Sequence, residues 1–167
     1  LAALLDAGAI ETWFQPVVRA ADGAIWGYEC LMRARDPENG ELVSPGQMIA
    51  WARQENLLLM LDRVCRETHI INAARADVPA DTTFLINFLP TVIYEPRFCL
   101  RSTERALAGT GLSPRQITFE VVETEAIEDH AHLRSILAHY RDKGFGVALD
   151  DLASGWSGLT LMAELEP

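Results

Sequence analysis

Short apolar strands that alternate with amphipathic helices constrain the fold of this chain more than any other feature. After two strand-like segments at residues 11–19 and 24–35, a buried strand and a helical pattern recur about every thirty residues. This alternation is typical of βα units, in which a helix connects two parallel strands. The sequence therefore predicts an α/β fold with a parallel sheet and an antiparallel hairpin at its N-terminal end.

The bounds of the expected elements follow from apolar periodicity and from turn residues. Strands are expected at residues 11–19, 24–35, 82–87, 117–122 and 146–149. Helices are expected at residues 1–8, 44–56, 57–76, 96–109, 126–143 and 159–165, and a polar loop at residues 36–41. On the helix at residues 57–76, four charged side chains are expected to face water, namely Asp62, Arg63, Arg66 and Glu67.

Composition narrows the class of protein. With 167 residues and 49% hydrophobic content, the chain suits one domain with a real core. Its net charge of −10 argues against binding to a nucleic acid polymer. No apolar run reaches the roughly 18–20 residues of a membrane span, and the N-terminal residues lack the basic start of a signal peptide. We therefore expect a cytoplasmic domain, cut from a longer protein because the chain begins without Met.

The cysteines and histidines are not expected to build a site. Cys30, Cys65 and Cys99 are odd in number, far apart and set among apolar residues. That pattern favours free, buried thiols over a disulfide framework. The histidines of residues 126–143 are expected on a solvated helix face and not as metal ligands.

Polar side chains recur near the C-terminal ends of successive predicted strands, and five residues share this placement: Glu29, Asn87, Glu120, Asp150 and Asp151. In (β/α) barrels, active sites are built at that edge. The adjacent carboxylates of Asp150 and Asp151 repel each other, and a divalent cation would remove the repulsion. The alternative for this pair is that it only ends a strand and caps the next helix. Ligands that are all oxygen suit Mg²⁺ or Mn²⁺.

The second predicted strand carries a further combination on one face. Because side chains alternate along a strand, Glu29, Leu31 and Arg33 point the same way. A carboxylate, an apolar contact and a guanidinium together suit a surface that holds a cation and an anionic ligand.

With these residues identified, the chain resembles the EAL domain of bacterial cyclic-di-GMP phosphodiesterases. Glu29-Cys-Leu-Met-Arg33 matches the Glu-x-Leu-x-Arg signature, with Cys30 in place of the usual Ala. Further segments match in order along the chain: Phe14-Gln15-Pro16, Ile86-Asn87-Phe-Leu-Pro90, Phe119-Glu120-Val-Val-Glu123 and Leu149-Asp150-Asp151-Leu-Ala-Ser-Gly155.

The resemblance implies a TIM-like (β/α) barrel of the EAL type and a hydrolase that uses two Mg²⁺ or Mn²⁺ ions. Water would attack one phosphodiester of cyclic-di-GMP and release pGpG. The implied metal ligands are Glu29, Asn87, Glu120, Asp150 and Asp151, with Glu123 in a supporting role and Glu29, Asp150 and Asp151 counted as catalytic. Ligand binding would fall to Gln15, Leu31 and Arg33.

Departures from the family pattern keep alternatives open. Family barrels need roughly 240–250 residues, so residues 1–167 are expected to be the N-terminal two-thirds of an incomplete barrel and inactive alone. Val122 and the segment Leu152-Ala-Ser replace the usual Thr and Phe-Gly-Thr. The alternatives are a degenerate EAL domain that binds cyclic-di-GMP or a partner protein without cleavage, and another metal-dependent barrel hydrolase. The resemblance leaves room for a homodimer and for attached sensor or GGDEF domains.

Overall fold

A single mixed sheet organises the part of the chain that the computed structural model describes, residues 1–121 and 129–149. Its strands are β1 (Ile10–Val18), β2 (Ile25–Arg35), β3 (Leu42–Val43), β4 (Thr83–Phe88), β5 (Ile117–Val121) and β6 (Gly146–Leu149). The order across the sheet is β1-β2-β4-β5-β6, and β3 pairs with β2. β1 runs antiparallel to β2, whereas β2, β4, β5 and β6 are parallel. The predicted α/β class, hairpin and parallel sheet are confirmed.

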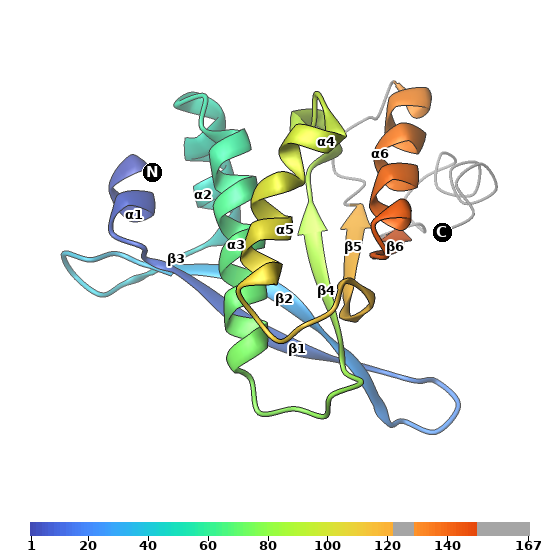
Figure 1. Ribbon diagram of the computed structural model, residues 1–167. Coiled ribbons are helices and arrows are strands. Elements are labelled where there is room, and N and C mark those ends of the chain that lie inside the picture. Colours follow the sequence, from blue (N-terminus) through green and yellow to red (C-terminus); the bar gives the residue numbers. More distant parts are fainter. Residues whose placement is uncertain (122–128, 150–167) are drawn as a thin grey trace.

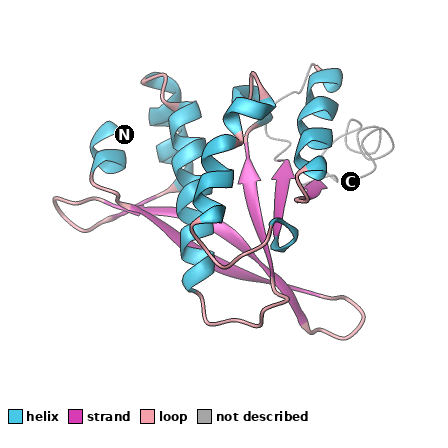
Figure 2. Cartoon of the chain, in the orientation of Figure 1, coloured by secondary structure: helices cyan, strands magenta, loops and turns pink. Residues whose placement is uncertain are grey.

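Helices cover one face of this sheet (Figures 1 and 2). They are α1 (Ala2–Asp6), α2 (Pro45–Gln54), α3 (Leu58–Arg75), α4 (Pro96–Cys99), α5 (Arg101–Ala108) and α6 (His130–Asp142), with short 3-10 turns at Pro90–Val92 and Pro114–Gln116. Figure 1 shows α3 and α5 side by side over the middle of the sheet. Alternate residues of β4 and β5, such as Phe84, Ile86 and Phe119, pack against this layer and are almost completely buried.

At the starts of α2 and α6, a local side chain satisfies a free backbone N–H group. The Ser44 hydroxyl accepts a hydrogen bond from the backbone N–H of Gln47, and Pro45 occupies the first helical position of α2. Likewise, the Asp129 carboxylate accepts from the backbone N–H of His132 at 2.8 Å and starts α6. The expected start of this helix at residue 126, and the expected helix at residues 159–165, lie outside the described residues.

Two elements differ from the expectation. The helix expected at residues 96–109 is divided at Leu100, which is completely buried between α4 and α5. No glycine or proline marks this division. The loop expected before α2 is followed by the two-residue strand β3, whose Val43 side chain is buried in the core.

The prediction that four charged side chains of α3 face water is wrong for Asp62 and Arg66. Arg63 is exposed, as expected, and it pairs with the half-buried Glu67 at 3.0 Å. Asp62 and Arg66, in contrast, are only 6% and 0% exposed. The reason is tertiary, because α4 and α5 pack over this side of α3 and supply polar partners for Arg66.

The cysteines are free thiols, as predicted, with Cys30 and Cys65 buried and Cys99 half-buried. No helix among residues 1–121 and 129–149 combines the length and apolarity needed to cross a bilayer.

A buried histidine tethers α3 to the hairpin. His69 is 3% exposed, and its Nδ1 lies 2.7 Å from the hydroxyl oxygen of Thr12 on β1. Asn72 Nδ2 donates to the same oxygen at 3.1 Å, which leaves the Thr12 hydroxyl free to donate to a neutral imidazole. Burial lowers the pKa of His69 from 6.5 to about 4.

This histidine makes stability depend on pH. Because the folded state disfavours the protonated ring, its contribution is fully present above about pH 6.5 and is lost as pH falls toward 4. The expected loss is about 1.4 kcal/mol per pH unit inside that window. Urea unfolding of wild type and His69→Gln at pH 7 and pH 5 measures it. The wild type should lose about 2 kcal/mol more than the variant between these pH values. Equal losses in both proteins would contradict this origin.

Candidate functional site

The register of the parallel strands gathers polar side chains on the face of the sheet that the helices do not cover. Asn87 of β4 pairs directly with Glu120 of β5, and Glu29 of β2 pairs with Leu85, two residues before Asn87. Paired residues of parallel strands, and residues two apart, point to the same face. Asn87 Nδ2 donates to Glu29 Oε1 at 2.9 Å. Three predicted metal ligands therefore share one edge of one face.

A glycine allows β2 to approach β4 closely beside this site. Gly27 pairs with Thr83, and a Cβ atom at residue 27 would lie 2.4 Å from the Thr83 carbonyl oxygen. Any larger residue would push the strands apart at this point. The missing side chain thus helps to set the spacing that lets Asn87 reach Glu29.

The antiparallel partner strand adds the predicted ligand-binding residues to the same face. In the β1–β2 register, Gln15 lies opposite Glu29 and Trp13 lies opposite Leu31. Gln15, Glu29, Leu31 and Arg33 therefore all project from one side of the hairpin. The structure brings these predicted residues together with Asn87 and Glu120.

Trp13 is a residue of this face that the sequence analysis missed. The Arg33 guanidinium carbon lies 5.3 Å from the centre of the Trp13 ring, and Arg33 Nη1 donates to the Met32 carbonyl at 2.7 Å. Trp13 Nε1 in turn donates to Glu11 Oε2 at 3.1 Å. These contacts orient the arginine through a cation–π interaction and a backbone hydrogen bond. Trp13 lies two residues before Gln15, so the alternation of side chains along β1 could have identified it.

A pocket of about 280 Å³ opens at the carboxyl ends of β2 and β4. Leu31, Arg33, Asn87 and Leu89 line it from the strand side, and residues of α2 and α3, among them the polar Asp62 and His69, line its other side. The pocket is therefore bounded by two of the residues expected to bind a ligand and one expected to bind metal.

The donor set fits a hard divalent cation. The amide oxygen of Asn87 is buried and has no hydrogen-bond partner among the described residues, because its NH₂ group is the one that contacts Glu29. With Glu29 and Glu120 it offers oxygen ligands alone, as Mg²⁺, Mn²⁺ and Ca²⁺ prefer. Within the described ranges, no three His, Cys, Asp or Glu side chains form a cluster that could hold a metal ion. Asp150, Asp151 and Glu123 lie outside those ranges.

Cys30, which occupies the position of the signature alanine, is an unreactive thiol. Its side chain points to the helix layer and is 1% exposed. Burial raises the pKa of the Cys30 thiol, and the charges of Glu29 and Glu120 raise it further. A neutral, buried thiol behaves as a small apolar side chain, so this replacement preserves the packing behind the site.

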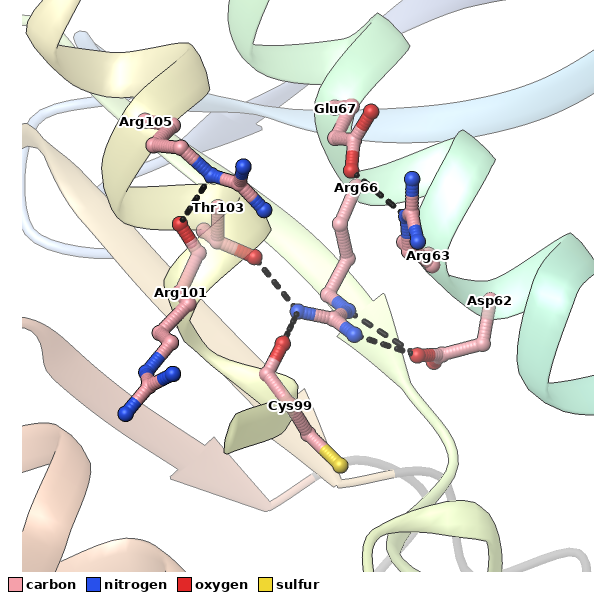
Figure 3. A network of polar contacts seen from close by, with 8 residues as sticks. All are labelled: Asp62, Arg63, Arg66, Glu67, Cys99, Arg101, Thr103 and Arg105. Carbon is pink, nitrogen blue, oxygen red and sulfur yellow. Dashed lines mark hydrogen bonds and ion pairs between the residues drawn. The ribbon is translucent and has the colours of Figure 1, made fainter. Parts of the chain in front are cut away.

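A buried ion pair holds the chain where it leaves β4. Asp62 Oδ2 pairs with Arg66 Nη2 at 2.8 Å, and Asp62 Oδ1 accepts from the backbone N–H of Leu89 at 3.1 Å. On its far side Arg66 donates to the Thr103 hydroxyl and to the Cys99 carbonyl (Figure 3). Since Leu89 is two residues beyond Asn87, this network fixes the strand end that presents the amide.

Breaking this pair should destabilise the domain strongly. Asp62→Asn removes the charge that Arg66 needs, and an uncompensated buried charge costs about 3–5 kcal/mol. The matched control is Glu67→Gln on the same helix, whose exposed pair with Arg63 is worth less than about 1 kcal/mol. Urea unfolding of the two variants measures the difference. Similar losses in both would show that the buried pair does not anchor this region.

A comparison with known families identifies the fold to which these residues belong. The family model of the EAL domain matches residues 1–167. The chain belongs to the EAL domain family. The predicted family and the fold of a TIM-like barrel with an N-terminal antiparallel pair are confirmed.

Individual EAL relatives agree with this assignment. The "Probable cyclic di-GMP phosphodiesterase PdeG" of Escherichia coli K12 is 29% identical over 169 residues, covering 96% of this chain and 32% of PdeG. The c-di-GMP bound form of a standalone EAL protein from Vibrio cholerae O395 is 34% identical, with a TM-score of 0.75 over 93% of this chain and 62% of that one. A manganese and cyclic-di-GMP complex of Klebsiella pneumoniae BlrP1 is 28% identical, with a TM-score of 0.78 over 95% of this chain and 39% of that one. The chain thus spans about a third of the length of PdeG.

Proposed function

We propose that this EAL chain belongs to a phosphodiesterase that hydrolyses cyclic-di-GMP to pGpG with the help of two Mg²⁺ or Mn²⁺ ions. The observation that carries the proposal is the Asn87–Glu29 hydrogen bond of 2.9 Å, with Glu120 in register beside it. It orients an otherwise unpartnered amide oxygen at the sheet edge where barrel active sites lie. The cyclic-di-GMP complexes of the Vibrio cholerae and Klebsiella pneumoniae relatives support the choice of substrate.

In this proposal Glu29, Asn87, Glu120 and Asp150 would hold the first ion, and Asp150 with Asp151 would help to hold the second. The bound ions would supply an activated water and offset the negative charge of the reacting phosphodiester. The remaining work falls to the chain's own residues. Glu29 fixes the Asn87 amide, Gln15 and Leu31 contact the dinucleotide, and Arg33 donates to a phosphate oxygen.

The proposal also covers a role for Glu123, the extent of the domain, the cellular location and the partners. Glu123 would support the metal ligands, and residues 1–167 would form the N-terminal two-thirds of the EAL domain. A cytoplasmic location, a homodimer and attached sensor or GGDEF domains remain consistent with the family.

Hydrolysis of cyclic-di-GMP by the full-length protein tests the proposal. With Mg²⁺ or Mn²⁺ present, chromatography should detect pGpG, and Glu29→Gln should lose nearly all of this activity because the site acts as a unit. Glu38→Gln, an exposed carboxylate in the loop after β2, is the matched control and should retain it. Binding of cyclic-di-GMP without pGpG would favour the degenerate domain, an alternative motivated by the Leu152-Ala-Ser departure. A protein that neither binds nor cleaves cyclic-di-GMP would refute the phosphodiesterase and leave only a degenerate domain that binds a partner protein.

Metal binding depends on the Asn87 amide in this proposal. Asn87→Ala should weaken Mn²⁺ binding by the full-length protein at least about tenfold, since even residues that only orient metal ligands have effects of this size. Titration calorimetry without dinucleotide measures this change. Asn39→Ala, which alters an exposed amide of the loop before β3, should leave the affinity unchanged. Equal affinities for Asn87→Ala and wild type would remove Asn87 from the ligand set.

The affinity for cyclic-di-GMP should depend strongly on Arg33 and less on the Trp13 ring that orients it. A charge-assisted contact is worth about 1.5–3 kcal/mol, so Arg33→Ala should weaken cyclic-di-GMP binding by roughly one to two decades. Trp13→Leu removes only the stacking surface and should cost less than about tenfold. Fluorescence titration in Ca²⁺ measures both variants. A larger loss for Trp13→Leu than for Arg33→Ala would reverse the assigned roles.

A further inference from the structure

A second hollow lies away from the proposed active site, on the outer side of the helix layer. It measures about 360 Å³, and its lining residues come from the first turns of α3, from α4 and from α5, with Tyr94 before α4. On α3 they are Leu59, Met60, Arg63 and Arg66, and on α4 and α5 they are Phe98, Cys99, Arg101, Ser102 and Arg105. Spacings of three and four residues place each set on one face of its helix. We call this surface the α3–α5 groove.

The groove exposes large apolar side chains that a solvated helix layer does not require. Tyr94 is 71% exposed, Phe98 56% and Met60 51%. Side chains of this size gathered in one concave patch indicate an interaction surface more than chance exposure.

The charge of the groove is opposite to that of the molecule. Four arginines line it and no lysine, aspartate or glutamate does so, although the whole chain has a net charge of −10. Arg63 and Arg66 are compensated by Glu67 and Asp62. Arg101 and Arg105 are exposed and have no carboxylate partner within residues 1–121 and 129–149. Arg101 instead lies over the Phe98 ring, 4.4 Å from its centre. Arg105 Nε donates to the Arg101 carbonyl (Figure 3).

The floor of the groove holds an unused polar atom. Ser102 is 8% exposed, and its hydroxyl oxygen is buried without a hydrogen-bond partner among the described residues. Buried hydroxyls are normally satisfied, so this one indicates a missing partner at the groove. The adjacent Arg66 is fixed by Asp62 and Thr103 and makes the floor rigid (Figure 3).

We propose that the α3–α5 groove docks an acidic segment of a separate partner protein, in which carboxylates flank an aromatic or aliphatic side chain. Tyr, Phe, Met and Arg are enriched at the cores of protein interfaces, whereas Lys, Glu, Asp and Ser are depleted, and the lining follows that composition apart from Ser102. The apolar side chain enters between Phe98 and Met60, its flanking carboxylates pair with Arg101 and Arg105, and a polar group of the segment meets the Ser102 hydroxyl. The proposal is independent of phosphodiesterase activity.

Selection from a random 12-residue peptide display library on the immobilised full-length protein tests this surface. Each round is counter-selected against the double variant Arg101→Glu/Arg105→Glu. We expect the recovered peptides to be enriched in Asp and Glu beside an aromatic or aliphatic residue. A synthetic peptide of the recovered sequence should bind wild type at least about tenfold more tightly than the double variant, and the difference should shrink at high salt.

Matched variants locate the binding. Tyr94→Ser/Phe98→Ser should also weaken the synthetic peptide, whereas Arg19→Glu/Arg115→Glu, which reverses two exposed arginines outside the groove, should not. Circular dichroism confirms that each variant is folded.

Recovery of no acidic peptides, or equal affinity for wild type and Arg101→Glu/Arg105→Glu, overturns the proposal. So does saturable sub-millimolar binding of pyrophosphate that the double variant loses, which would assign the groove to small anions. Dissociation of a homodimer by the double variant would assign it to a second copy of the chain.

Discussion

The register between parallel strands is the constraint on which the candidate site depends. Pairing of Asn87 with Glu120, and of Glu29 with Leu85, places residues far apart in the chain on one face and at one edge. The helix layer buries the opposite side chains of the same strands, such as Ile86 and Phe119, and so prevents a one-residue slip. A slip would move the carboxylates into the apolar core. Hydrophobic burial thus enforces the arrangement of polar groups on the other face.

The second constraint is the buried Asp62–Arg66 pair. It ties α3 to the backbone at Leu89 and to Thr103 of α5, and so links the helix layer to the strand end that presents Asn87. A pair of this kind contributes little net stability compared with an apolar replacement. Its effect is positional, because the carboxylate can accept the Leu89 N–H only while Arg66 holds it in place.

The sequence predicted those features whose cause is local. Period-two alternation placed Glu29, Leu31 and Arg33 on one face, and buried apolar runs located β4, β5 and β6 within a residue or two at each end. Asp62 and Arg66 were assigned to solvent because an i, i+4 ion pair looks the same in sequence whether or not another helix covers it. The division at Leu100 and the strand β3 likewise arise from packing between segments that the chain order does not place together. The Asp150–Asp151 pair, prominent in the sequence, lies outside the described residues.

We propose that the Asn87 amide oxygen, with Glu29 and Glu120, forms a divalent metal site. Anomalous diffraction from crystals of the full-length protein soaked in Mn²⁺ tests it most directly. We expect an anomalous peak in contact with Asn87 Oδ1 and both glutamate carboxylates, present in wild type and absent in Asn87→Ala. A Mn²⁺ peak elsewhere, or no peak at this strand edge at saturating Mn²⁺, would contradict it.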